Sequence, residues 1–147
     1  MTDFPVIEIV GLTGILIRFG AAMSEPANRA AIAFRAAVDE ASWPEVSETT
    51  ISLVSTFLVV DLVAHEAAPI IERLSTLLDT QDWFAAPLPA GRTLWHIPTV
   101  YGTDLAPQLE EAASLAGVDP EEAIRQLSTA RVRVLTIGFA PGQPYMG

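Results

Sequence analysis

The sequence predicts an α+β fold in which residues 1–84 contain four strands and two helices in the order ββαββα. Two observations support it. Short runs rich in strand-forming residues come in two pairs, and each pair is followed by a segment with an apolar stripe at helical spacing. Two helices with one apolar face each can cover one face of a four-stranded antiparallel sheet. The expected architecture is therefore two-layered.

The first pair of strands is predicted at Val6–Val10 and Ile15–Phe19, with a glycine-containing turn between them. Ser24 then provides an N-cap for a helix that ends near Trp43, with Pro26 in its first turn. The apolar face of this helix is formed by Ala27, Ala30, Ala31, Phe34, Ala37, Val38 and Ala41. This half of the unit is expected to be a hairpin followed by an amphipathic helix.

The second pair of strands lies within residues 47–63, where the hydrophobic period changes to two. We predict two strands with a turn near Ser55. Because no glycine or proline marks that turn, one long strand is the alternative. The second helix is predicted from Glu66 to Asp79, with Pro69 in the first turn, where a missing N–H costs little.

Residues 85–91 are small, proline-rich and uncharged, and they predict a linker to a second domain at residues 92–147. There we expect a strand at Arg92–Tyr101, a helix from Asp104 to Ala116, another helix after Asp119, and a strand at Val132–Phe139. These elements are too few to bury their own faces. The second domain is therefore expected to be incomplete.

Composition excludes several classes of function. Acidic residues outnumber basic ones 18 to 8, lysine is absent, and the formal charge is −10, which disfavours binding to nucleic acid. The helix-turn-helix spacing at Leu109–Leu127 is read as a helical hairpin, because its second helix begins with carboxylates. A phosphate-binding loop that needs lysine is impossible.

The same composition bears on metals and location. There is no cysteine, and two histidines alone cannot make a three-ligand metal site, so no metal is expected. No apolar run approaches a membrane span and no secretory signal begins the chain, so we expect a cytoplasmic protein without a membrane partner.

The most distinctive stretch is Thr136–Gly147, where an apolar strand leads into a loop of glycine, proline and aromatic residues. A tight turn that closes a β element is one interpretation, and a ligand-approaching loop is the other. His96 lies in the sequence Trp-His-Ile-Pro. It is a candidate polar contact, or a histidine that is simply exposed or hydrogen-bonded in the core.

Three segments in order carry a family resemblance: Ile15–Phe19 leading to Ser-Glu-Pro-Ala-Asn-Arg at 24–29, His-Ile-Pro-Thr-Val-Tyr-Gly at 96–102 with Asp-Leu-Ala-Pro-Gln-Leu-Glu at 104–110, and Gly-Phe-Ala-Pro-Gly-Gln-Pro-Tyr-Met-Gly at 138–147. Together they resemble the KipI family. Its members are also called the B-type subunit of bacterial 5-oxoprolinase (PxpB) and allophanate hydrolase subunit 1, and they match carboxyltransferase subdomains C and D of urea amidolyase. The family usually has an aromatic residue where this chain has Gln143.

The resemblance implies a DCoH-like N-terminal domain followed by a cyclophilin-like β-barrel with inserted helices. In the family a long β-rich stretch follows the terminal motif and supplies most of the barrel. This chain is therefore expected to be a fragment or to be completed by a separate chain. Its terminal loop is then expected to be poorly ordered or held by another chain.

The resemblance further implies a subunit of an ATP-dependent amide-hydrolysing complex that opens 5-oxoproline to glutamate. The partners would be a C-type carboxyltransferase-homologous subunit and an A-type, LamB/YcsF-like subunit. ATP would be used by the complex, and no cofactor is expected on this chain. No catalytic residue is assigned. The motif positions expected to line a substrate or subunit pocket are Tyr101, Gly102, Gly138, Phe139, Pro141, Gly142 and Tyr145.

Two other functions are open at this point. KipI-like proteins inhibit a sensor histidine kinase by binding its dimerisation helices, and the N-terminal sheet with its acidic surface offers a comparable module. Allophanate hydrolysis or carboxyl transfer in urea breakdown is the other alternative.

Overall fold

The computed structural model describes residues 3–138, 140 and 142–147. The fold is α+β, with the order ββαββα followed by two helices and two short strands. It divides into two compact units, Met1–Gly91 with Val134–Gly147, and Arg92–Arg133. The predicted division into a domain at 1–84, a linker at 85–91 and a second domain at 92–147 stays a prediction. The last two strands, which lie within Val134–Gly147, pack with the first unit.

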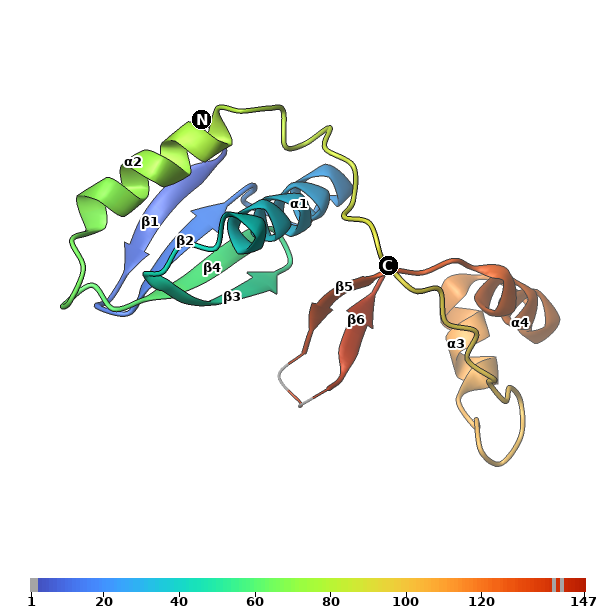
Figure 1. The fold of residues 1–147 in the computed structure, drawn as a ribbon. Helices are drawn as coiled ribbons and strands as arrows, with labels where there is room; N and C mark the ends of the chain where they lie inside the picture. The colour runs from blue at the N-terminus through green and yellow to red at the C-terminus, as the bar shows by residue number, and fades with distance from the viewer. Residues whose placement is uncertain (1–2, 139, 141) are drawn as a thin grey trace. The chain divides into compact units, whose positions relative to one another are not determined.

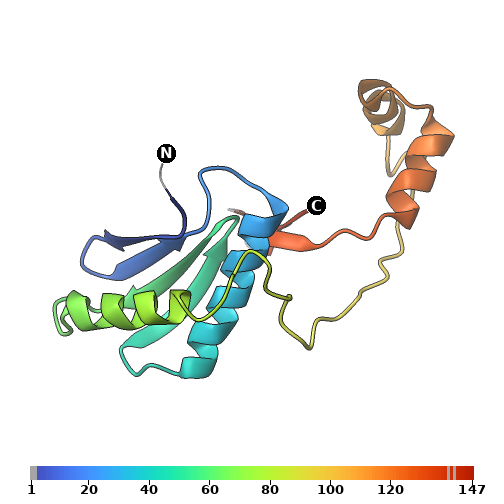
Figure 2. The ribbon, with the colours of Figure 1, turned by 90° about the horizontal axis from the view of Figure 1, so that it is seen from above.

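The first unit contains a four-stranded antiparallel sheet in the order β1-β2-β4-β3. Helices α1 and α2 lie against it (Figures 1 and 2). This confirms the predicted ββαββα order, including two strands rather than one within residues 47–63. The bounds are Val6–Val10 for β1, Gly14–Arg18 for β2, Glu25–Ala41 for α1, Val46–Ser52 for β3, Ser55–Val60 for β4 and Ala67–Leu78 for α2.

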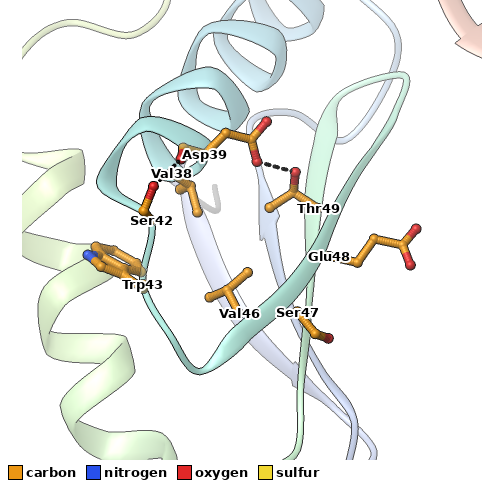
Figure 3. Close-up of a pocket in the computed structure, with 8 residues that line it drawn as sticks. All are labelled: Val38, Asp39, Ser42, Trp43, Val46, Ser47, Glu48 and Thr49. Carbon is orange, nitrogen blue, oxygen red and sulfur yellow. Dashed lines mark hydrogen bonds between the residues drawn. The ribbon is translucent and has the colours of Figure 1, made fainter.

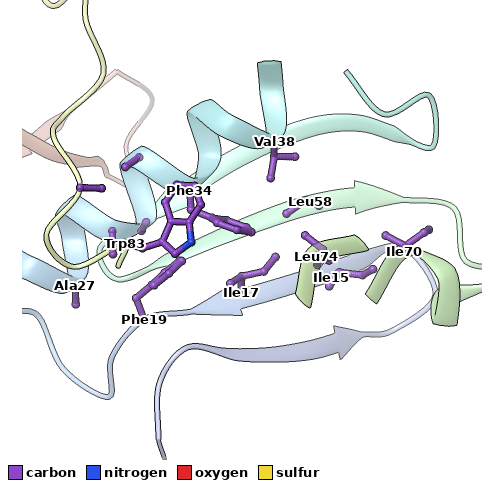
Figure 4. Packing of buried hydrophobic residues seen from close by; sticks show 14 of the residues in the cluster. Ile15, Ile17, Phe19, Ala27, Phe34, Val38, Leu58, Ile70, Leu74 and Trp83 are labelled. Atoms are coloured by element: carbon purple, nitrogen blue, oxygen red, sulfur yellow. The ribbon is translucent and has the colours of Figure 1, made fainter. Parts of the chain in front are cut away.

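The core lies between the sheet and the two helices, as Figure 4 shows. Ile17 of β2 and Leu58 of β4 point to the helical side, where Phe34 of α1 and Leu74 of α2 meet them, and all four are fully buried. Burying one such side chain contributes about 1.5–3 kcal/mol. The alternation along each strand therefore fixes which sheet face the helices cover.

Local signals set the element ends. Ser24 caps α1, because its Oγ accepts a hydrogen bond from the Ala27 N–H at 3.4 Å. The turn between β3 and β4 contains Leu53 with a positive φ of 49°, although no glycine marks it. Such a conformation is uncommon for a branched residue and needs support from its surroundings.

The chain stays on the core beyond α2. Trp83 is 5% exposed, its ring meets Phe34 edge-on with centroids 5.1 Å apart, and its Nε1–H donates to the Leu78 carbonyl at 2.9 Å. Ala86 is also buried in the same cluster. The start of the predicted linker therefore packs against the first unit.

The second unit is a helical hairpin of α3 (Leu109–Ala116) and α4 (Pro120–Thr129). Gly117 ends α3 in the left-handed conformation, and Asp119 caps α4 by accepting the Glu122 N–H at 2.8 Å. The end of the first helix at Ala116 and the start of the second after Asp119 were predicted from the sequence, and the structure confirms both.

Two predictions in this unit are wrong. Residues 92–100 form no strand in the described structure, because a strand needs a partner ladder and Pro98 also removes a donor. The first helix begins at Leu109 rather than after Asp104. Residues 103–106 make a turn closed by the Ala106 N–H to the Thr103 carbonyl at 2.7 Å, and Pro107 separates that turn from the helix.

The chain closes with an antiparallel pair, β5 (Val134–Ile137) and β6 (Pro144–Met146), here called the terminal hairpin. β5 confirms the strand predicted in this region, although it is shorter, and β6 was not predicted. The remainder of the barrel that the family resemblance implies stays a prediction.

Candidate functional site

The terminal hairpin carries the motif residues of the sequence-predicted site. The Gly138 N–H donates to the Gln143 carbonyl at 2.6 Å, and the Gln143 N–H donates to the Ala140 carbonyl at 3.0 Å. Gly142 has a φ of +78°, a conformation that costs other residues about 1–2 kcal/mol. The described part of this loop is therefore a hydrogen-bonded turn that depends on glycine.

The Tyr145 ring lies directly against the Gly138 backbone. A Cβ added to Gly138 would come within 2.4 Å of Tyr145 Cε2, far inside contact distance. Tyr145 is nevertheless 52% exposed, so its side chain does not fill a core. It is not isolated from solvent. The expectation for Phe139 and the predicted role of Pro141 fall outside the described residues.

The other predicted site residues lie in the second unit. His96 is exposed in the extended segment, and Tyr101 is half-buried. Gly102 has a φ of +67°, and an added Cβ would approach Leu109 Cδ2 to 3.1 Å, so this glycine packs beside the start of α3. The structure thus joins Gly138 with Tyr145 in one hairpin. Whether Tyr101 and Gly102 share a pocket with them stays a prediction.

Asn28 is a residue that sequence reasoning did not assign to the site. It is completely buried in α1, and its Nδ2 donates to the Leu135 carbonyl of β5 at 3.1 Å. A polar residue between Ala27 and Ala30 on an apolar helix face was the signal available in the sequence. A buried amide in such a position requires hydrogen-bond partners.

The resolved pKa shifts concern residues that are not part of the terminal hairpin. A hydrogen bond with its own backbone, and then one from Arg73 at 2.7 Å, hold the pKa of Glu45 below its usual value. Arg73 also lies over the Trp43 ring, 4.9 Å from its centroid. In the second unit, hydrogen bonds from Arg125 and Gln126 lower the pKa of Glu122. The Glu45–Arg73 contact joins α2 to the segment before β3, the Glu122 contacts lie within α4, and neither makes a reactive group.

Among the described residues of the first unit, two hollows can be noted, and no sequence-predicted site residue lines either. One, of about 150 Å³, is at the end of α1 beside β3 (Figure 3). There the Thr49 hydroxyl donates to Asp39 at 2.5 Å and accepts from Arg35 Nε at 2.9 Å, so these polar groups satisfy one another. The other, of about 320 Å³, lies between α1 and the segment Gln81–Ala90.

Over the residues that the structure describes, no three His, Cys, Asp or Glu side chains come together in a way that suits a metal ion. None of the described helices has the length and apolar character needed to cross a bilayer.

Comparison with known proteins adds two relatives. The 5-oxoprolinase B-type subunit of Bacillus subtilis (strain 168) is 27% identical over 155 residues, covering 96% of this chain and 62% of the relative. The crystal structure of TTHA0988 is 27% identical, with a TM-score of 0.65 over 90% of this chain and 24% of that one. The chain thus spans less than two thirds of each relative.

The family match covers nearly the entire chain. The model of the family described as "Carboxyltransferase domain, subdomain C and D" matches residues 5–147. That range contains both the ββαββα unit and the terminal hairpin with its glycine-dependent turn. The chain therefore belongs to the carboxyltransferase domain family of subdomains C and D.

Proposed function

We propose that this chain is the B-type subunit, or part of it, of an ATP-dependent 5-oxoprolinase that opens 5-oxo-L-proline to L-glutamate. The observation that carries the proposal is the 27% identity to a protein named as the B-type component of 5-oxoprolinase, across 96% of this chain. The family model matches residues 5–147, a range that includes the segments by which the sequence resembles that family. In this proposal the complex works in the cytoplasm.

The chain's part in that reaction is binding rather than chemistry. The described residues near the terminal turn are glycines and an exposed aromatic ring, which can pack closely against a ligand or another subunit. ATP and the catalytic groups would come from the partner subunits, a C-type carboxyltransferase homologue and an A-type, LamB/YcsF-like protein. Gly138, Gly142 and Tyr145 of the terminal hairpin would line such a contact, and the family motif assigns a lining role to Tyr101 and Gly102 as well.

Reconstitution tests the proposal. The natural protein that contains this chain is mixed with the A-type and C-type subunits, and glutamate formed from 5-oxoproline is measured with and without ATP. Turnover that requires ATP and all three components is the expected result. A complete mixture without ATP-dependent turnover would refute the assignment.

A matched pair of glycine variants tests the role of the terminal turn. Gly142 and Gly91 have φ values of +78° and +79°, and an added Cβ would meet nothing within 4 Å at either position. Alanine therefore brings a similar backbone strain of about 1–2 kcal/mol to both. We expect Gly142→Ala to lower turnover at least about 5-fold, since 1 kcal/mol is close to that factor, and Gly91→Ala to leave it unchanged. Equal effects would mean that the turn has no special role.

A carboxyl-transfer role in urea breakdown is a second candidate, because the matched family is named for a carboxyltransferase domain. The neighbouring genes discriminate between the two candidates. A biotin carboxylase gene beside this one supports the urea route, whereas a LamB/YcsF-like gene supports oxoprolinase.

A further inference from the structure

The side chain of Asn28 links three segments of the first unit. It lies in the first turns of α1 and has no exposed surface. Its Nδ2 donates to the Leu53 carbonyl at 2.5 Å and to the Leu135 carbonyl at 3.1 Å. Both acceptors are backbone oxygens, so the amide nitrogen and not its oxygen must face them. One amide therefore joins α1 to the β3–β4 turn and to β5.

Apolar packing covers β5 only in part, because Leu135 is half-buried whereas the residues at the two ends of the strand are exposed. Val134 is 47% exposed and Ile137 is 61% exposed. A second described polar contact, from Thr136 Oγ1 to the Ile51 carbonyl, is 3.4 Å long and therefore near the limit for a hydrogen bond. The buried amide of Asn28 is the shorter of these two contacts and is shielded from water. A buried amide that lost this hydrogen bond would destabilise the fold, because no water could replace the partner.

The turn at the other end of the link is unusual as well. Leu53, whose carbonyl accepts from Asn28, has the positive φ of 49°. A hydrogen bond to this carbonyl helps to hold the uncommon backbone conformation. The same side chain thus fixes the β3–β4 turn and the strand that leads into Gly138.

We propose that Asn28 is the positioning residue of the terminal hairpin, and that docking of the hairpin is coupled through it to the β3–β4 turn. Its functional meaning rests on the proposed role of the terminal turn in subunit or substrate contact. A ligand that binds the docked hairpin then stabilises the link, and by thermodynamic reciprocity the link strengthens ligand binding.

Hydrogen–deuterium exchange measures the docking without substrate. Asn28→Leu keeps the number and branching of the side-chain heavy atoms and removes both donors. Amides of residues 134–147 are expected to exchange on the order of 10-fold faster, because a buried hydrogen bond of about 1.4 kcal/mol corresponds to that factor. Amides of β2 and β4 are expected to keep their protection relative to wild type. Leu53→Gly tests the coupling, because it relaxes the turn and leaves the Asn28 amide in place. It is expected to speed exchange at residues 134–147, but by less than Asn28→Leu does.

Unchanged exchange at residues 134–147 in folded Asn28→Leu would overturn the proposal, as would equal release of the hairpin by Leu53→Gly. Should Asn28→Leu fail to fold, NMR of the wild-type protein decides. The Asn28 side-chain amide protons are expected to exchange slowly and to show NOEs to Leu135 or Thr136, and absence of these NOEs refutes the link. None of these readouts depends on turnover. A protein without oxoprolinase activity would therefore overturn the proposed function and leave the docking result standing.

Discussion

Gly14 and Phe57 form a pair whose energetic coupling has a predictable sign. Gly14 is buried in β2, and Phe57 is on the sheet face away from the helices, because its neighbours Thr56 and Leu58 point into the core. A Cβ added to Gly14 would lie 2.1 Å from Phe57 Cζ. Carbon atoms normally approach to about 3.5–4.0 Å, so the ring would have to move by roughly 1.5 Å. The perturbation is Gly14→Ala, alone and with Phe57→Ala.

The magnitude follows from two opposed terms. Overpacking against the ring costs typically about 1–3 kcal/mol, and removal of a glycine from a strand returns about 0.5–1 kcal/mol. In the wild-type background Gly14→Ala is therefore expected to destabilise the protein by about 1–2 kcal/mol. Once Phe57 is alanine, the same change is expected to be neutral or stabilising.

The assay is urea unfolding followed by circular dichroism for the four members of the double-mutant cycle. The coupling free energy between the two sites should be about 1–3 kcal/mol, within the range found for residues in contact. If Gly14→Ala has the same effect in both backgrounds, the ring does not rest on this glycine and the reasoning fails.

Two other stability predictions follow. Trp83→Phe removes the hydrogen bond to the last turn of α2 and should lower the free energy of unfolding by about 1–2 kcal/mol. The control Trp95→Phe, at a position 77% exposed, should change it by less than about 0.5 kcal/mol. Urea unfolding of both variants measures the difference. Glu45→Gln should reduce stability at neutral pH. Because folding lowers the pKa of Glu45, its contribution is present above the usual value of 4.5 and is lost as pH falls through the folded pKa. The difference from wild type in thermal unfolding should therefore shrink toward low pH, and a constant difference would contradict this.

Periodicity and capping were enough to predict the ββαββα part of the first unit and the start of α4. Ile15, Ile17 and Phe34 repeat at the spacing of the elements that bury them, and Ser24 and Asp119 cap helices by the local geometry that their side chains favour. Such signals act within a few residues of the chain. They are therefore readable without knowledge of the tertiary structure.

Signals that depend on distant segments were missed. Residues 92–100 have strand-like composition, but strand formation depends on a partner that the sequence pattern does not specify. Asn28 and Leu135 are 107 residues apart in the sequence. The only local sign of their contact is a single polar residue in an apolar stripe. The site residues Gly138 and Tyr145 were named by family resemblance, and their mutual packing is seen only in three dimensions.

The return of β5 and β6 to the first unit makes the segment Arg92–Arg133 an insertion, because the chain both leaves and re-enters the same compact body. Docking the hairpin therefore closes a loop that contains the second unit. The entropy cost of closing a flexible loop rises only by about 0.6 kcal/mol for each doubling of its length. Insertions or deletions within this excursion are thus nearly neutral for hairpin docking, which leaves the second unit free to vary while the motif at the chain's end keeps its place.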